Sequence, residues 1–369
     1  MAAHQDAQAT VPAPPIDEAR IEEFAERILG DLAATMATAF SVLGDRLGLF
    51  RALSEGAATS DQLAARTRLD ERYVREWASG LMAAGYLDYE SATQRFTLPV
   101  EHAAVLSDEG GPAFLGGAHQ FVGELLKVLD PVEQAFRHGG GVPLEQYGDA
   151  FWQGVERLTG ISFEHQLVQE WIPAVVGLED KLRDGAVLAD IGCGSGVAAI
   201  KIANAFPRCE VHGFDIHAPN IARAARAARE AGVDDRVSFQ ELDAIAGIPG
   251  SYDVITFFDV VHDSRDPVGL MSAARAALRD AGVCVVLEIN CHEDLDENTG
   301  PVGALFYGSS LLHCMTQSLA ADGAGLGSCG LPEARLRSLC LEAGFQSLEC
   351  VAEGPLDLLY EARVAPGGC

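Results

Sequence analysis

Through the first 180 residues, apolar side chains recur every three or four positions, which is typical of helices. This spacing predicts a long helical stretch over residues 21–53, a capped short helix from Thr59 and a further helix from Asp70. Residues 86–89 and 95–98 predict two short strands around a polar turn. Three helices followed by a hairpin are typical of a winged helix.

From Gly185 onward, short apolar runs alternate with helical segments. The runs expected to form strands are residues 186–190, 210–214, 236–242, 252–258, 283–289, 346–352 and 356–363. This alternation predicts an α/β fold with a Rossmann-like, seven-stranded, mostly parallel sheet. Because no helix separates the last two runs, we expect them to form an antiparallel hairpin at one edge.

The net charge of the chain limits the classes of partner that it can bind. Among 369 residues, 26 Lys and Arg stand against 54 Asp and Glu, a net charge of −28. Such a surface repels phosphate backbones and anionic lipids, so we expect neither nucleic acid nor membrane as a partner. No uncharged apolar run approaches about 18 residues, so no transmembrane helix is expected. Nine cysteines without a CxxC motif argue against a zinc ribbon or a disulfide framework and favour a cytoplasmic protein.

The predicted winged helix raises the question of DNA binding. Its candidate recognition helix, residues 70–84, carries two arginines, Arg72 and Arg75. They stand beside three acids, Asp70, Glu71 and Glu76, so the helix has no basic stripe. DNA readers cluster Lys and Arg on the docking face. We therefore favour a dimerisation module, and keep a winged-helix transcriptional regulator as a less favoured function.

The most informative motif is Asp190-Ile191-Gly192-Cys193-Gly194-Ser195-Gly196, which follows a strand and opens a helix. Asp190 at the end of the strand would repel the pyrophosphate of a dinucleotide but attract the ammonium group of an amino-acid cofactor. Asp215 ends the second strand, where an acid can bind both hydroxyls of a ribose. Asp243 and Ala244 end the third strand, in a position to meet an adenine amino group. Together these residues point to S-adenosylmethionine (SAM) rather than NAD.

On these motifs, residues 185–290 resemble the core of class I SAM-dependent methyltransferases. The segments LGDRLGLFRAL and VREWASGLMAAGYL are similar to the N-terminal dimerisation domain of small-molecule O-methyltransferases. The resemblance implies a homodimer in which Asp190, Gly192 and Gly194 contact the methionine part of SAM, Asp215 the ribose and Asp243 the adenine. Ala244 and Phe258, at neighbouring strand ends, complete the expected cofactor site.

The same patterns predict the domain organisation. We expect a disordered lead-in (1–17), a winged-helix dimerisation domain (18–105), a helical linker and substrate lid (106–180) and a SAM-binding catalytic domain (181–369). A second glycine-rich stretch, residues 323–330, follows no clear strand. It is expected to be a mobile flap or an irregular connection.

Two readings compete for the chemistry that follows the fourth strand of the sheet. In one, His262 is a general base, because its ordinary pKa near 6.5 suits removal of a hydroxyl proton. The His262-Asp263 pair resembles the position of the catalytic His in plant-type O-methyltransferases. This reading predicts metal-free O-methylation of a small phenolic or hydroxylated metabolite.

In the other reading, His262, Asp263 and His313 hold one Fe or Zn ion, because two His and one carboxylate form a facial triad. The set resembles metal-dependent C-methyltransferases of 2-oxo acids, which make β-methyl amino acid precursors of peptide natural products. Chelation would stabilise an enolate whose β-carbon accepts the methyl group. Cys314 is a further candidate ligand, although the His-Asp-His set needs no thiolate. The candidates for a supporting partner or base follow the fifth strand, and they are Glu288, Asn290, His292 and Glu293. On the sequence alone, we prefer this metal-assisted C-methylation.

Overall fold

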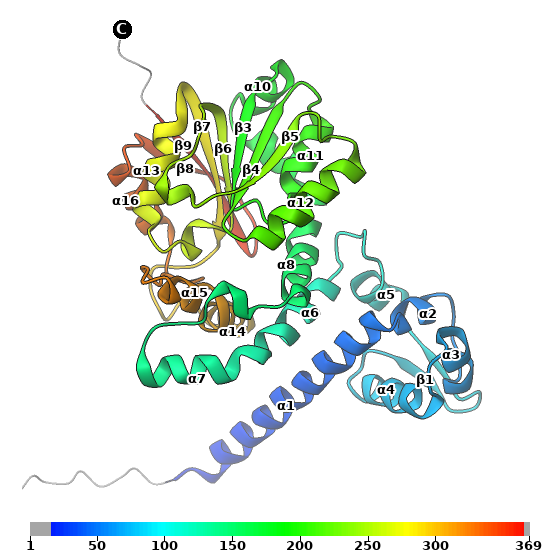
Figure 1. Ribbon diagram of the computed structural model, residues 1–369. Coiled ribbons are helices and arrows are strands. Elements are labelled where there is room, and N and C mark those ends of the chain that lie inside the picture. The colour runs from blue at the N-terminus through cyan, green and yellow to red at the C-terminus, as the bar shows by residue number, and fades with distance from the viewer. Residues whose placement is uncertain (1–15, 365–369) are drawn as a thin grey trace, which may run out of the picture. The chain divides into compact units, whose positions relative to one another are not determined.

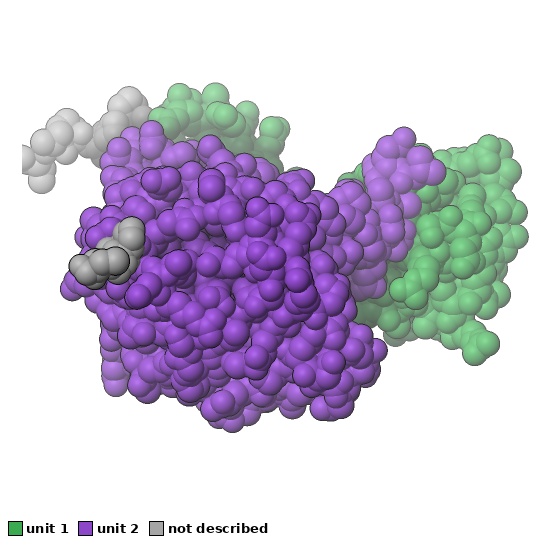
Figure 2. Space-filling model, turned by 90° about the horizontal axis from the view of Figure 1, so that it is seen from above, with its two compact units in different colours: residues 1–99 green, residues 100–369 purple. Residues whose placement is uncertain are grey.

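The computed structural model describes residues 16–364, so most of the predicted lead-in, 1–17, lies outside the described residues. The chain divides into two compact units, residues 1–99 and 100–369 (Figure 2). The helical segment 106–180 belongs to the second unit together with the sheet. The finer division of that unit into lid and catalytic domain stays a prediction.

The first unit has the predicted order of three helical regions and a hairpin (Figure 1). Its elements are α1 (Glu18–Arg46), α2 (Leu49–Ser54), α3 (Ser60–Thr67), α4 (Glu71–Ala83), β1 (Asp88–Glu90) and β2 (Arg95–Thr97). Gly48, with φ of 69°, separates α1 from α2, which the spacing had joined. A capping box of Thr59 and Gln62 starts α3, as the sequence predicted. The winged-helix prediction is confirmed.

Glycines let the C-terminal half of α1 approach α4. A Cβ atom at Gly80 would lie 2.5 Å from the ring of Phe40, and one at Gly44 would lie 2.6 Å from Trp77. The Trp77 indole donates a hydrogen bond of 2.8 Å to the carbonyl of Phe40. These contacts bury one face of this half of the helix, at Ala37, Ser41 and Gly44.

The N-terminal half of α1 instead exposes its apolar stripe. Ile21, Phe24, Leu32 and Met36 are each more than half exposed, although their spacing places them on one face. By length and composition alone, α1 could cross a membrane, although Asp31 interrupts its apolar run. One such helix is weak evidence of a membrane span, and an exposed apolar stripe of this kind marks an interaction surface.

The second unit begins with helices and continues into the sheet. Its first part comprises α5 (Val100–Leu106), α6 (Gly116–Leu125), η1 (Leu126–Val128), α7 (Leu129–His138), η2 (Leu144–Gln146), α8 (Asp149–Ser162), the π-helix η3 (Phe163–Trp171), α9 (Ile172–Ala174) and α10 (Leu178–Asp184). Gly117 lets α6 pack on α8, because a Cβ atom there would lie 2.6 Å from the backbone nitrogen of Leu158.

The sheet has the predicted seven strands. Strands and helices alternate as β3 (Val187–Ile191), α11 (Val197–Ala205), β4 (Glu210–Asp215), α12 (Ala218–Ala231), β5 (Val237–Glu241), η4 (Ala244–Ala246), β6 (Tyr252–Phe258), η5 (Val261–Asp263), α13 (Pro267–Ala277), β7 (Leu278–Ile289), α14 (Gly300–Ser309), the π-helix η6 (Ser310–Cys314), α15 (Met315–Ala320), α16 (Glu333–Glu342), β8 (Ser347–Glu353) and β9 (Asp357–Arg363). The strand order is β5-β4-β3-β6-β7-β9-β8.

The topology confirms the predicted Rossmann-like fold. Strands β3 to β7 run parallel, whereas β9 lies antiparallel between β7 and β8. Helices cover both faces: α10, α11 and α12 pack on one face, and α13 and α16 on the other (Figure 1). The order reverses at β3, where β4 lies on one side and β6 on the other. Ligands of such sheets bind at the carboxyl ends of the strands beside this reversal.

Candidate active site

The glycine-rich turn between β3 and α11 is built as its sequence predicts. Gly192 adopts a φ of 69°, and a Cβ atom there would lie 2.5 Å from Val260. Its N–H donates a hydrogen bond of 2.7 Å to the carbonyl of Phe214 on β4. Gly194, with φ of 53°, has no atom within 4 Å of its Cβ position, so the turn is open on that side. An L-residue at either glycine would be strained.

Asp190 is buried at the end of β3. Its carboxylate accepts a hydrogen bond of 2.7 Å from Thr256 on β6. Burial, together with the nearby charge of Asp215, raises the pKa of Asp190 to about 7, although the Thr256 hydrogen bond opposes the shift. A cationic ligand at this position would favour the ionised carboxylate.

The other two predicted acids follow the next strands. The Asp215 carboxylate accepts hydrogen bonds from the backbone N–H of Gly194 at 2.9 Å and of His217 at 2.7 Å, which fixes it beside the glycine turn. The Asp243 carboxylate pairs with Arg265 at 2.7 Å, a partner that the sequence analysis did not foresee.

One cavity of about 280 Å³ joins these residues to the acceptor candidates. The predicted site residues that line it are Asp190, Gly192, Gly194, Asp215, Asp243, Ala244, Phe258, Asp263 and His313. His262 does not line the cavity: it is 3% exposed and lies behind Asp263. The structure therefore brings the predicted residues together, with His262 one side chain away from the cavity.

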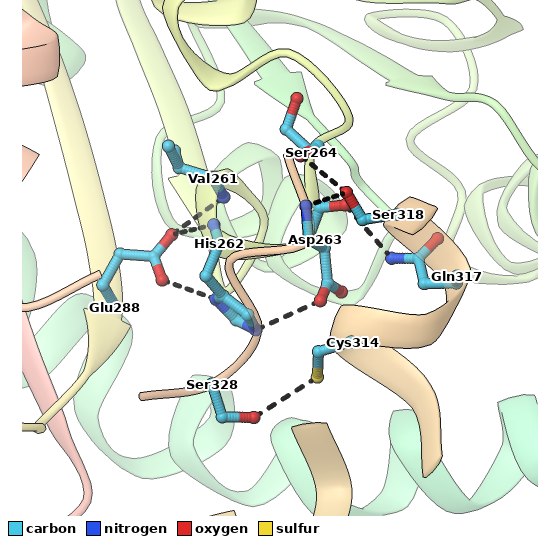
Figure 3. A network of polar contacts seen from close by, with 10 residues as sticks. Val261, His262, Asp263, Ser264, Glu288, Cys314, Gln317, Ser318 and Ser328 are labelled. Carbon is cyan, nitrogen blue, oxygen red and sulfur yellow. Dashed lines mark hydrogen bonds and ion pairs between the residues drawn. The ribbon is translucent and has the colours of Figure 1, made fainter. Parts of the chain in front are cut away.

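His262 is held between carboxylates from two elements (Figure 3). Its Nδ1 lies 2.6 Å from Oε2 of Glu288 on β7, and its Nε2 lies 3.3 Å from Oδ1 of Asp263. The other Glu288 oxygen accepts the backbone N–H of Val261 at 2.8 Å. Burial lowers the pKa of His262, but the charges of Glu288 and Asp263 outweigh it and hold the pKa well above 6.5.

Donor atoms suited to a metal ion cluster around the same imidazole. Atoms of His262, Asp263 and Cys314 lie within 4.8 Å of one another, and so do atoms of Asp259, His262 and Glu288. His313, the third ligand in the sequence hypothesis, belongs to neither group. Cys314, which follows it on η6, occupies that place.

His313 lies instead among aromatic rings. Ring centroids of Tyr147, Phe151 and Trp152 are 4.8, 4.7 and 5.8 Å from that of His313. Burial lowers the pKa of His313, so its ring is neutral at pH 7. Its Nδ1 is buried without a hydrogen-bond partner among the described residues. The rings of Trp152 and His313 line the cavity, and the rings of Tyr147 and Phe151 pack against His313.

Sequence reasoning missed Asp259, the residue directly after β6. It lines the cavity and adopts a φ of 58°, which is uncommon for a residue other than glycine. Burial and the neighbouring charge of Glu288 raise the pKa of Asp259 to about 7. Its position one residue after a buried strand was the available signal, because ligands gather at strand ends.

The second glycine-rich stretch, residues 323–330, is an irregular connection packed beside the site. Ser328 Oγ donates to Cys314 Sγ at 3.4 Å, and the N–H of Gly325 donates to Ser318 Oγ at 3.1 Å. Leu326 and Ser328 are buried. These contacts anchor η6 and α15, which carry part of the cavity wall.

Comparison with known proteins identifies the class of fold. Residues 182–310 match a family model described as a methyltransferase domain, and residues 34–108 match one described as an Rv2258c-like winged HTH domain. Among curated relatives, 27-O-demethylrifamycin SV methyltransferase of Amycolatopsis mediterranei is 38% identical over 27% of this chain and 38% of its own length. The chain spans 24% to 58% of the length of the curated relatives it matches.

Solved structures match over nearly the whole chain. A protein of Nostoc punctiforme assigned as an O-methyltransferase superimposes with a TM-score of 0.70 at 21% identity, covering 91% of this chain and 98% of that one. Human N-acetylserotonin methyltransferase, solved in complex with SAM, gives a TM-score of 0.63 at 18% identity, covering 92% and 98%. The chain therefore has the class I SAM-dependent methyltransferase fold with an N-terminal winged HTH domain, as its motifs indicated.

Proposed function

We propose that the protein transfers the methyl group of SAM to an oxygen atom of a small hydroxylated molecule. The observation that carries the proposal is a row of three polar side chains: Glu288 contacts His262, and His262 contacts Asp263. Asp263 lies on the wall of the cavity that the glycine turn helps to form. This is the metal-free alternative of the sequence analysis. Matches to the O-methyltransferases named above favour it over C-methylation.

The residues present fit SAM. The open side of Gly194 leaves room for a ligand, Asp190 offers a buried carboxylate to an ammonium group, and Asp215 is fixed beside the turn to meet ribose hydroxyls. Bound SAM would supply a methyl group on a positively charged sulfur, which a deprotonated oxygen can displace. The acids at the ends of β3, β4 and β5, namely Asp190, Asp215 and Asp243, line the cavity and attract such a cation. Glu156, Asp259 and Asp263 also line the cavity.

The chain's own contribution is to orient and deprotonate the acceptor. Asp263 lines the cavity and accepts the hydrogen bond of the acceptor hydroxyl. As the oxygen attacks the methyl group, its proton passes to the Asp263 carboxylate and from there to Nε2 of neutral His262, which lies 3.3 Å from Oδ1 of Asp263. Glu288 fixes the ring because Nδ1–H points at its carboxylate, which leaves Nε2 as the basic nitrogen. Glu288 also stabilises the imidazolium that results.

Turnover with labelled SAM over a panel of phenols tests the proposal, with His262→Ala and Asp263→Asn as variants. We expect both variants to bind SAM with unchanged affinity in calorimetry and to lose at least about 100-fold in kcat. The exposed Asp180→Asn serves as a control. A His262→Ala enzyme with wild-type kcat would contradict the assignment.

Metal-assisted C-methylation of the β-carbon of a 2-oxo acid is the second candidate. The cluster of His262, Asp263 and Cys314 donors favours it. Metal analysis after adding Fe(II) or Zn(II) back separates the two candidates. About one ion per chain, lost in Cys314→Ser, together with methylation of a 2-oxo acid, would establish C-methylation in place of O-methylation.

A further inference from the structure

The acceptor side of the cavity is acidic, and the basic side chain that the turn after β6 contributes to it is already paired with an acid. Asp259 and Asp263 line it from that turn, and Glu156 lines it from α8. Arg265, in the same turn, is paired with Asp243 at 2.7 Å. The other lining arginine, Arg223, comes from α12 beyond β4, and its guanidinium contacts Asn220 and Asp149.

Asp259 has no role in the proposed transfer, yet it is held in an unusual position. Its backbone takes a left-handed φ of 58°, and its N–H donates to the carbonyl of Leu287 at 2.9 Å. Within residues 16–364, no side chain or backbone group donates a hydrogen bond to its carboxylate. Backbone strain of this kind persists where the surrounding structure fixes the residue.

The carboxylate of Asp259 is close to the deprotonating group. One of its oxygens lies within 4.8 Å of a ring nitrogen of His262 and of an oxygen of Glu288. A group bound by Asp259 is therefore a near neighbour of the hydroxyl that loses its proton. The buried, unpartnered Nδ1 of His313 and the ring of Trp152 line the same cavity, so a flat acceptor with more than one polar group fits there.

Building on the proposed methyl transfer, we propose that the acceptor carries a protonated amine that Asp259 binds beside the methylated hydroxyl. An ammonium group would supply the donors that the Asp259 carboxylate lacks and offset the charges of Asp263 and Glu156. The aromatic side chains of the cavity also favour a cation near their faces. An acceptor with a carboxylate at this position would face like charges instead, which disfavours its binding.

Three ortho-substituted phenols of similar size test the charge preference. They are 2-(aminomethyl)phenol as the cation, 2-ethylphenol as the neutral analogue and 2-hydroxybenzoate as the anion. Binding is measured by calorimetry in the presence of S-adenosylhomocysteine, and methyl transfer separately with labelled SAM. Because the two readouts are independent, a failure of methyl transfer is distinguishable from a failure of amine recognition.

We expect the amine to bind at least about tenfold more tightly than 2-ethylphenol, and 2-hydroxybenzoate to bind most weakly. In Asp259→Asn the preference for the amine over 2-ethylphenol should fall to about threefold or less. Asn also tolerates left-handed φ values, so this variant keeps the backbone of the turn. The control Asp180→Asn removes an exposed acid outside the cavity and should keep the wild-type preference.

Equal binding of the three phenols, or preference for the anion, would overturn the proposal. So would an amine preference that survives in Asp259→Asn. About one divalent ion per chain, lost in Asp259→Asn, would mean that this carboxylate serves a metal, and would overturn the proposal as well.

Discussion

Glu288 Oε2 lies 2.6 Å from Nδ1 of His262, and both side chains are almost completely buried, at 1% and 3% exposure. The two residues come from different elements, β7 and η5, and meet behind the wall of the ligand cavity. A carboxylate in this position fixes the ring orientation and raises the basicity of the opposite nitrogen. The strength of His262 as a base therefore depends on Glu288.

Replacing Glu288 with Gln tests this dependence. Gln keeps the shape but loses the charge that raises the pKa of His262, so that pKa should fall. Because only neutral His262 accepts a proton, wild-type kcat/KM should rise with pH through a pKa well above 6.5. In Glu288→Gln that rise should move to lower pH, with a kcat lowered about tenfold or more. The pH profile of kcat/KM is the measurement.

The control for that variant is Glu361→Gln, which removes another buried carboxylate, on β9 beside β7. Its pH profile should match that of the wild type. An unshifted profile in Glu288→Gln would contradict the positioning role, even if kcat fell.

SAM affinity should depend on pH through Asp190. Burial raises the pKa of this carboxyl to about 7 in the ligand-free protein, so below that pH it is mostly protonated. Binding of an ammonium group requires the ionised form. The affinity for SAM should therefore fall by up to about tenfold per pH unit as pH decreases below 7. Calorimetric titrations from pH 5.5 to 8 measure this dependence, and Asp190→Asn should flatten it. An affinity independent of pH in the wild type would refute the role.

Lowering the pH has the opposite effect on the stability of the ligand-free protein: through Asp190 it weakens SAM binding but stabilises the fold. Because the folded-state pKa of Asp190 is raised above its unfolded value, its contribution to stability is fully present below about pH 4 and is lost as pH rises through about 7.

Gly192 should not tolerate a side chain. In Gly192→Ala the methyl group would meet Val260 at 2.5 Å while φ stays at 69°, so we expect a loss of about 2 kcal/mol in the free energy of unfolding, with weaker SAM binding. Gly160→Ala, in α8 with no atom within 4 Å of its Cβ position, should instead stabilise the protein by up to about 1 kcal/mol. Denaturant unfolding of both variants is the measurement. Equal stability of the two would show that the turn relaxes.

Sequence patterns predicted the sheet well because its central strands, β3, β6 and β7, are mostly buried apolar runs. Residues 252–258 form β6 as expected, and the acids at the strand ends line one cavity. The sequence pattern could not show that Cys314, and not His313, lies beside His262, because this depends on the π-helix η6 that carries both residues. Asp259 escaped notice because its left-handed backbone depends on the turn after β6 and not on any periodicity.

Helical spacing also predicted α1 but not what covers it. Ile21, Phe24 and Leu32 lie more than half exposed along one face of the first unit's longest helix, and an uncovered apolar stripe of this kind is unfavourable in water. We propose that a second copy of the chain covers it, which forms a homodimer. Leu32→Asp should weaken self-association at least about tenfold, because a buried charge would have no partner, while Glu26→Gln should leave it unchanged. Sedimentation velocity over a concentration series measures both. A wild-type chain that sediments as a monomer, or that floats with lipid vesicles, would show that the stripe serves another purpose.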